Sequence, residues 1–109
     1  MKLNIYDKKK VVKTYTADTY DLKFGTLEDV ADAIDLDSLE TGSNAEILKM
    51  AGGVVLKSRE TIKDLMKDIF DGITDEELRG VTIAEMALVL VEVVQYTLQQ
   101  LKIGFNSKN

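Results

Sequence analysis

Alternating apolar and polar positions occupy the first part of the chain. Leu3 and Ile5 alternate with polar neighbours, and residues 11–16 are rich in β-branched and aromatic side chains, which favour strands. Because the polar run 7–10 lies between these two segments, the pattern predicts an N-terminal β-hairpin. The alternation returns over residues 20–24, which allows a third short strand.

Helical spacing of apolar residues replaces the alternation after Gly25. Residues 26–36 form a short amphipathic pattern with an acidic first turn. A longer apolar stripe covers residues 47–69 and predicts the longest helix of the chain. Gly52 and Gly53 lie inside this stripe, and each costs about 1 kcal/mol relative to alanine in a helix. We therefore expect a closely packed backbone or a mild kink there.

Capping patterns mark where the helices begin. A serine or threonine followed three residues later by glutamate occurs at Ser43, Thr74 and Thr82, and this is the pattern of a capping box. Three glycines suit the ends of helices: Gly72, Gly80 and Gly104. The last of them is expected to end the final helix, which leaves residues 105–109 as a mobile tail.

The predicted last helix carries more apolar surface than one small core needs. Apolar residues recur at i, i+3, i+4 and i+7 over residues 83–101 and form one continuous core stripe. At 100° per residue, Val89, Val93 and Tyr96 fall mainly on a second ridge, with Leu88 beside them. We expect Leu88, Val89, Val93 and Tyr96 to bind a partner or a second copy of the chain. The alternative is that the N-terminal sheet buries them.

The composition favours one α+β domain that binds protein. The chain has 109 residues and no proline, so residues 1–104 are expected to form a single unit with a hairpin and a mainly helical C-terminal half. Its formal net charge of −5 opposes binding to nucleic acid or to anionic membranes. No apolar segment follows Met1 and no apolar run is long enough to cross a bilayer, so a cytoplasmic location is expected.

No residue pattern indicates catalysis or a cofactor. Cysteine and histidine are both absent, which removes thiol nucleophiles, the usual zinc ligands and histidine bases. The acidic stretches 32–37 and 68–77 do not have the ligand spacing of a calcium loop, and helix caps explain them better. The triplet at Ser38 matches the attachment site of acyl carrier proteins, but Ser43 is the better helix cap. We therefore predict no enzyme activity, no metal and no cofactor.

The segment Asp-Ile-Phe-Asp-Gly-Ile-Thr-Asp-Glu-Glu-Leu at residues 68–78, followed by the apolar helix, resembles the tail assembly chaperones of long-tailed bacteriophages of Gram-positive bacteria. In that family a turn like Ile-Phe-Pro-Gly-Leu-Thr and an acidic Glu-Glu-Leu lead into a final apolar helix. Asp71 stands here in place of the proline. The resemblance covers the organisation of residues 24–101 and is specific at residues 70–78.

The resemblance implies a function in the cytoplasm of a bacterial host. A tail assembly chaperone would bind the long tape measure protein, keep it soluble and help recruit tail-tube subunits around it. It would also associate with itself. Two alternatives stay open: a small homo-oligomeric adaptor or inhibitor whose second ridge closes a dimer, and a carrier protein modified on Ser38.

Overall fold

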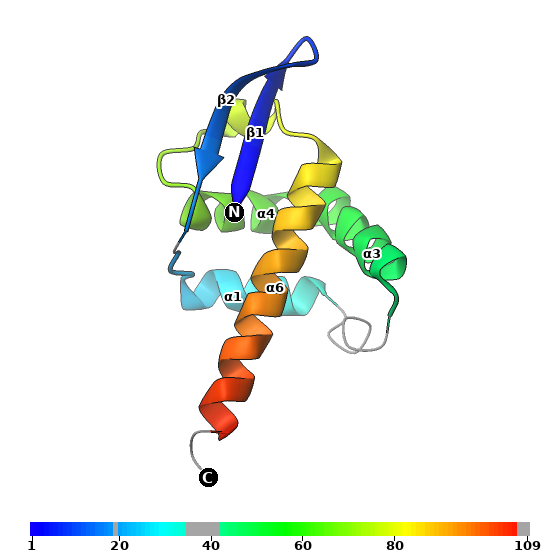
Figure 1. Cartoon of the computed structure of the whole chain (residues 1–109), viewed down its shortest axis with the longest axis vertical. Helices are drawn as coiled ribbons and strands as arrows, with labels where there is room; N and C mark the ends of the chain where they lie inside the picture. The colour runs from blue at the N-terminus through cyan, green and yellow to red at the C-terminus, as the bar shows by residue number, and fades with distance from the viewer. Residues whose placement is uncertain (19, 35–41, 107–109) are drawn as a thin grey trace.

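The hairpin and the helices follow one another along the chain in a computed structural model that describes residues 1–18, 20–34 and 42–106, with side chains to residue 97. Their bounds are β1 Lys2–Asp7, β2 Lys10–Thr16, α1 Phe24–Ala33, α3 Asn44–Lys57, α4 Arg59–Ile69, α5 Asp75–Leu78 and α6 Ile83–Asn106 (Figure 1). A two-stranded antiparallel sheet thus precedes five helices in the described part of the chain. This confirms the predicted α+β class.

The hairpin closes through a two-residue turn. Asp7 pairs with Lys10, and Lys8 and Lys9 have φ angles of 52° and 70°. Positive φ at both central residues is the geometry of a type I′ turn, whose twist matches that of the flanking strands. The predicted hairpin is therefore confirmed. The prediction of a third strand is wrong, because residues 20–23 belong to no strand and Phe24 already begins α1.

The strand β1 lies against the helices. Its Leu3 and Ile5 side chains are buried in the core, whereas β2 is exposed along most of its length. The Tyr6 N–H donates to the Gly80 carbonyl oxygen at 2.7 Å, and the Asn4 N–H donates to Glu85 Oε1 at 3.3 Å. The hairpin is thus attached to the start of α6 and to the segment before it.

The helix α1 begins two residues earlier than the sequence predicts. Its first turn includes Gly25, and the Lys23 N-cap makes no side-chain cap hydrogen bond of its own. Asp68 of α4 holds this end of the helix by another contact, because its Oδ2 accepts the N–H of Lys23 itself at 3.2 Å while its Oδ1 lies 3.3 Å from Lys23 Nζ. Partial burial alone would raise the pKa of Asp68, but hydrogen bonds from the Thr26 hydroxyl and from Lys23 lower it.

The long central helix predicted over residues 47–69 is wrong, because the chain leaves helical geometry at Ser58 (φ −118°, ψ 53°). The two halves, α3 and α4, can then bury their apolar stripes against different partners. Helix α3 packs on α6, and α4 packs on α1. The longest helix is α6, with 24 residues.

The predicted close backbone contact at Gly52 and Gly53 is also wrong, whereas the mild kink stays a prediction. Both glycines lie inside α3, and a Cβ atom built on either of them meets nothing within 4 Å. Neither position therefore needs glycine for steric reasons.

Each of the substitutions Gly52→Ala and Gly53→Ala should raise the free energy of unfolding by about 0.4–1 kcal/mol. Alanine restricts the unfolded chain and is the better helix former, while the open space around both positions accepts the methyl group. Urea unfolding of the purified protein measures the change as a higher midpoint with an unaltered slope. A lower midpoint would show that another backbone does pack against α3.

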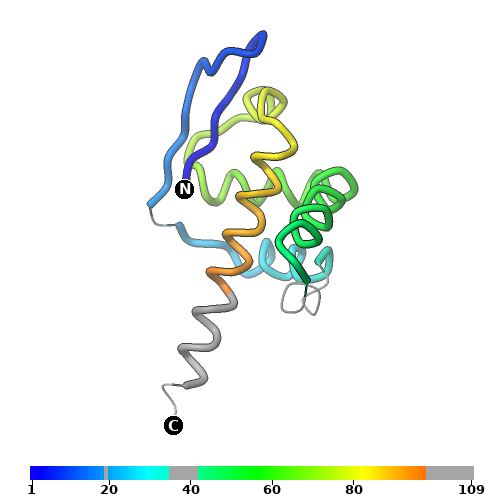
Figure 2. The backbone as a smooth tube through the Cα atoms, turned by 45° about the vertical axis from the view of Figure 1, so that its right-hand side comes forward, coloured from blue at the N-terminus to red at the C-terminus, as the bar shows by residue number. Residues whose placement is uncertain are grey.

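The core forms around the buried face of α6. Figures 1 and 2 show this helix passing between the hairpin on one side and α3 on the other. The largest side chains that are fully buried come from β1, α4, the end of α4 and α6: Leu3, Leu65, Met66, Phe70, Leu90 and Val93. Helix α6 continues through Gly104 to Asn106, so the predicted end at Gly104 is wrong. Residues 107–109 lie outside the described residues.

None of the helices described here is long and apolar enough to cross a membrane.

Candidate partner-binding surface

The segment between α4 and α6 is organised by a turn and a capping box. Gly72 has a φ angle of 84°, and the Ile73 N–H donates to the Phe70 carbonyl oxygen at 3.2 Å. Thr74 Oγ1 then accepts the Glu77 N–H at 3.1 Å, while Glu77 Oε1 accepts the Thr74 N–H at 3.2 Å. The capping box predicted at Thr74 is therefore confirmed.

A polar contact joins α5 to the hairpin. The Tyr15 hydroxyl donates to Glu77 Oε1 at 2.6 Å, and Lys13 Nζ lies 3.0 Å from Glu77 Oε2. The Tyr15 hydrogen bond and the Lys13 ammonium lower the pKa of Glu77 to about 2. The Tyr15 ring also contacts Phe70 edge to face, with centroids 6.4 Å apart. The contacts to Glu77 hold the short helix α5 against β2, and the ring contact joins β2 to the end of α4.

An apolar groove of about 200 Å³ opens between the end of α3, the start of α4, α5 and the start of α6. Its floor is continuous with the core, whereas Leu56 and Ile83 at its mouth are 60% and 49% exposed. Seven apolar residues line it: Val55, Leu56, Ile62, Leu78, Val81, Ile83 and Met86. We call this feature the apolar groove.

Four charged residues complete the lining of the apolar groove: Arg59, Lys63, Asp75 and Arg79. Asp75 is paired with Lys67 outside the groove at 2.6 Å, and Lys63 is paired with Glu60 at 3.6 Å. Within the described residues, neither arginine has a carboxylate within 4.0 Å. These are the two arginines of the whole chain, so the groove carries positive charge available to a ligand.

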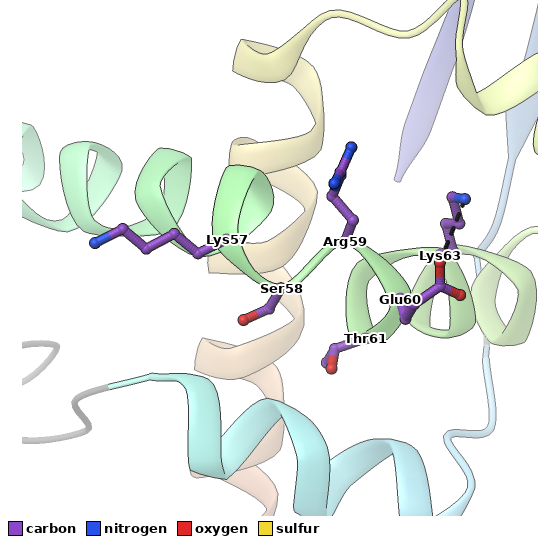
Figure 3. Close-up of a pocket in the computed structure, with 6 residues that line it drawn as sticks. All are labelled: Lys57, Ser58, Arg59, Glu60, Thr61 and Lys63. Carbon is purple, nitrogen blue, oxygen red and sulfur yellow. Dashed lines mark ion pairs between the residues drawn. The ribbon is translucent and has the colours of Figure 1, made fainter.

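A shallow polar concavity of about 550 Å³ lies beside the groove at the junction of α3 and α4. It shares Arg59 and Lys63 with the groove lining. Figure 3 shows these two side chains extending toward the same side of α4, while Lys57 and Thr61 extend elsewhere. Because the polar groups do not converge on one point, the concavity has no arrangement suited to acid–base or nucleophilic chemistry.

The structure separates the four residues that the sequence assigned to a binding ridge. Val89 and Val93 are only 3% and 1% exposed, so their placement on a surface is wrong. They are buried because β1 and α3 both pack on α6 and together cover a wide face of that helix. Leu88 and Tyr96 are 50% and 48% exposed, and the Tyr96 ring contacts Tyr20 with centroids 5.3 Å apart.

The sequence alone does not reveal the apolar groove, because its lining comes from four helices and the segment between α5 and α6. Ile83 was assigned to the core stripe, but it is the first residue of α6 and stays half exposed. The one sequence signal that could have indicated the groove is the position of Arg79, which directly follows the lining residue Leu78.

Within the described ranges, no three acidic side chains lie close enough together to hold a metal ion. Ser38, the residue considered for a carrier protein, and the acidic residues 35 and 37 lie outside those ranges.

Comparison of the chain with models of known protein families, with curated proteins and with solved structures finds no match.

Proposed function

We propose that the chain is a tail assembly chaperone of a long-tailed bacteriophage or prophage, and that its apolar groove binds a helical segment of the tape measure protein. The observation that carries the proposal is the groove itself. Contiguous exposed apolar surface is a common mark of a protein-binding site, and here Leu56 and Ile83 are exposed beside the apolar lining of one depression.

The size of the groove favours a protein ligand. Small-molecule sites have volumes of roughly 300–1,000 Å³, whereas this groove has about 200 Å³. That space suits the anchoring side chains of an amphipathic helix, which enter a groove at i, i+3 or i+4 and i+7 spacing while the rest of the helix stays outside.

The family resemblance and the groove involve the same part of the chain. Residues 68–78 carry the resemblance, and from this segment Asp75 and Leu78 line the groove, followed directly by Arg79. The turn at Gly72 and the capping box at Thr74 set the position of this wall. The proposed tape measure client would be held soluble in the host cytoplasm while tail-tube subunits assemble around it.

Self-association belongs to the same proposal and uses a different surface. Leu88 and Tyr96 are half exposed on α6, and neither lines the groove. If this surface bound a second copy of the chain and the groove bound nothing, the chain would be a homo-oligomeric adaptor or inhibitor, the alternative that the sequence left open. Loss of self-association in Tyr96→Asp, with client binding intact, would separate the two surfaces.

Ile83→Asp should weaken client binding by about tenfold or more, because it places a carboxylate at the mouth of an apolar anchor site. The fold should survive, since Ile83 is half exposed and a carboxylate in the first turn of a helix is favourable. The measurement is the soluble fraction of the tape measure protein of the phage that encodes this chain, co-expressed with each variant. Melting curves check the fold.

Phe24→Asp is the matched control. Phe24 is the first residue of α1, is 76% exposed and lies outside the groove, so the variant gains the same charge at the same helix position. It should keep the client soluble. Equal client solubility with the wild type and with Ile83→Asp would remove the groove from the proposal. A client that stays insoluble with the wild-type chain would overturn the chaperone function.

A further inference from the structure

We infer that the apolar groove selects a helix that carries acidic side chains beside its apolar anchors. The inference rests on the proposed function, because it specifies the client segment that the same groove binds. Two features support it: the sign of the charge at the groove and the chemistry of the residues that carry that charge.

The charge at the groove is opposite to that of the chain as a whole. The chain has a formal net charge of −5, yet three of the four charged residues that line the groove are basic. The single acid among them, Asp75, is already paired with Lys67 at 2.6 Å. A basic ligand would therefore be favoured by most of the molecular surface but opposed at the groove, whereas an acidic ligand finds its complement there.

The two arginines are suited to hold carboxylates. A guanidinium group presents a planar set of donors that matches a carboxylate and can bind it through two parallel hydrogen bonds. Lys63 at the same groove is paired with Glu60, whereas Arg59 and Arg79 have no carboxylate within 4.0 Å among the described residues. Their donors are available to a ligand without first breaking an internal ion pair.

The arginines also lie on separate elements. Arg59 is the first residue of α4, and Arg79 is the residue that follows α5. Both line a groove whose lining is otherwise apolar apart from Lys63 and Asp75. A helix that inserts leucine-like anchors between these elements brings its flanking residues to the two guanidinium groups. Glutamate or aspartate at those flanking positions would add electrostatic attraction to the apolar contact.

Three designed peptides test the inference. Each has about 20 residues, above the length at which isolated helices are marginal in water, and each carries leucines at i, i+3, i+4 and i+7. They differ only in the flanking residues, which are glutamate, glutamine or lysine. Fluorescence anisotropy with the full chain should show that the glutamate peptide binds about tenfold more tightly than the glutamine peptide. The lysine peptide should bind most weakly of the three. This preference should shrink as salt is added.

The charge-reversed double variant Arg59→Glu with Arg79→Glu should invert the order, so that the lysine peptide binds most tightly. Lys8→Glu with Lys9→Glu is the matched control, because it changes the net charge equally at the hairpin turn, outside the groove lining. The control should keep the preference for glutamate. Melting curves establish that both double variants are folded.

Equal binding of the three peptides, binding of none of them, or an inverted order in the Lys8 and Lys9 control would each overturn the inference. These results are distinct from a failure of the proposed function. A chain that prefers the glutamate peptide but leaves the tape measure protein insoluble contradicts the chaperone function alone. A chain that keeps the tape measure protein soluble but binds the three peptides equally contradicts the acidic client alone.

Discussion

The Val93→Glu variant should lose about 3–5 kcal/mol of its free energy of unfolding, or fail to fold. Val93 is 1% exposed in a core that includes Leu90 and Val94 of the same helix, so the new carboxylate would be buried without a partner. A loss of this size is comparable with the total stability of a small domain, about 5–15 kcal/mol. Thermal and urea unfolding of the purified variant measure it.

Tyr96→Asp provides the comparison on the same helix. Tyr96 is 48% exposed, so an acidic residue there should cost far less, mainly through the lost contact with the Tyr20 ring. A Val93→Glu protein that melts like the wild type and loses only its self-association would contradict the buried position of Val93. It would also restore the interface that the sequence indicated.

The misplacement of Val89 and Val93 has a general physical cause. Hydrophobic spacing identifies which residues of a helix lie on a common face, but not how many neighbours cover that face. Helix α6 is packed by β1 on one side and by α3 on another, so both of its apolar ridges are needed for one core. The apolar surplus that suggested a partner is therefore largely used within the chain.

Local signals predicted the fold best where the interaction itself is local. The hairpin alternation and the caps at Ser43, Thr74 and Thr82 depend on residues within a few positions of each other, and all appear in the structure. The break at Ser58 was not predictable in this way, because no glycine, proline or capping hydrogen bond marks it. Tertiary packing of α3 on α6 and of α4 on α1 determines it.

The candidate groove could not be predicted from the sequence for the same reason. Its lining residues span positions 55–86 and come together only when α3, α4, α5 and the start of α6 are assembled. The sequence drew attention to residues 68–78 through a resemblance that stays a prediction. It could not show that this segment forms one wall of a depression whose other walls come from α3 and α4.

Gly80→Ala should destabilise the domain by about 1–3 kcal/mol, the usual cost of overpacking a tight contact. A Cβ atom at this position would lie 2.8 Å from the Tyr6 carbonyl oxygen and 3.1 Å from Ile5 Cγ2. The nearer atom belongs to the backbone, so the hairpin itself must shift. That shift strains the 2.7 Å hydrogen bond from the Tyr6 N–H to the Gly80 carbonyl oxygen.

Gly25→Ala is the control for this substitution, because Gly25 lies in α1 and an added Cβ meets nothing within 4 Å. It should be neutral or stabilising, and urea unfolding compares the two variants directly. A Gly80→Ala protein as stable as the wild type would show that the hairpin does not need this close approach.

The same substitution connects the hairpin to the proposed site. Gly80 lies between Arg79 and Val81, and both of these neighbours line the apolar groove. When the hairpin shifts away from position 80, the wall that α5 contributes should lose its fixed position against β1. We therefore expect Gly80→Ala to weaken binding of the glutamate peptide as well as stability, whereas Gly25→Ala should change neither. Peptide affinity is measured well below the melting temperature of each variant, where the protein is folded. A loss of affinity there reports a displaced groove wall and not unfolding.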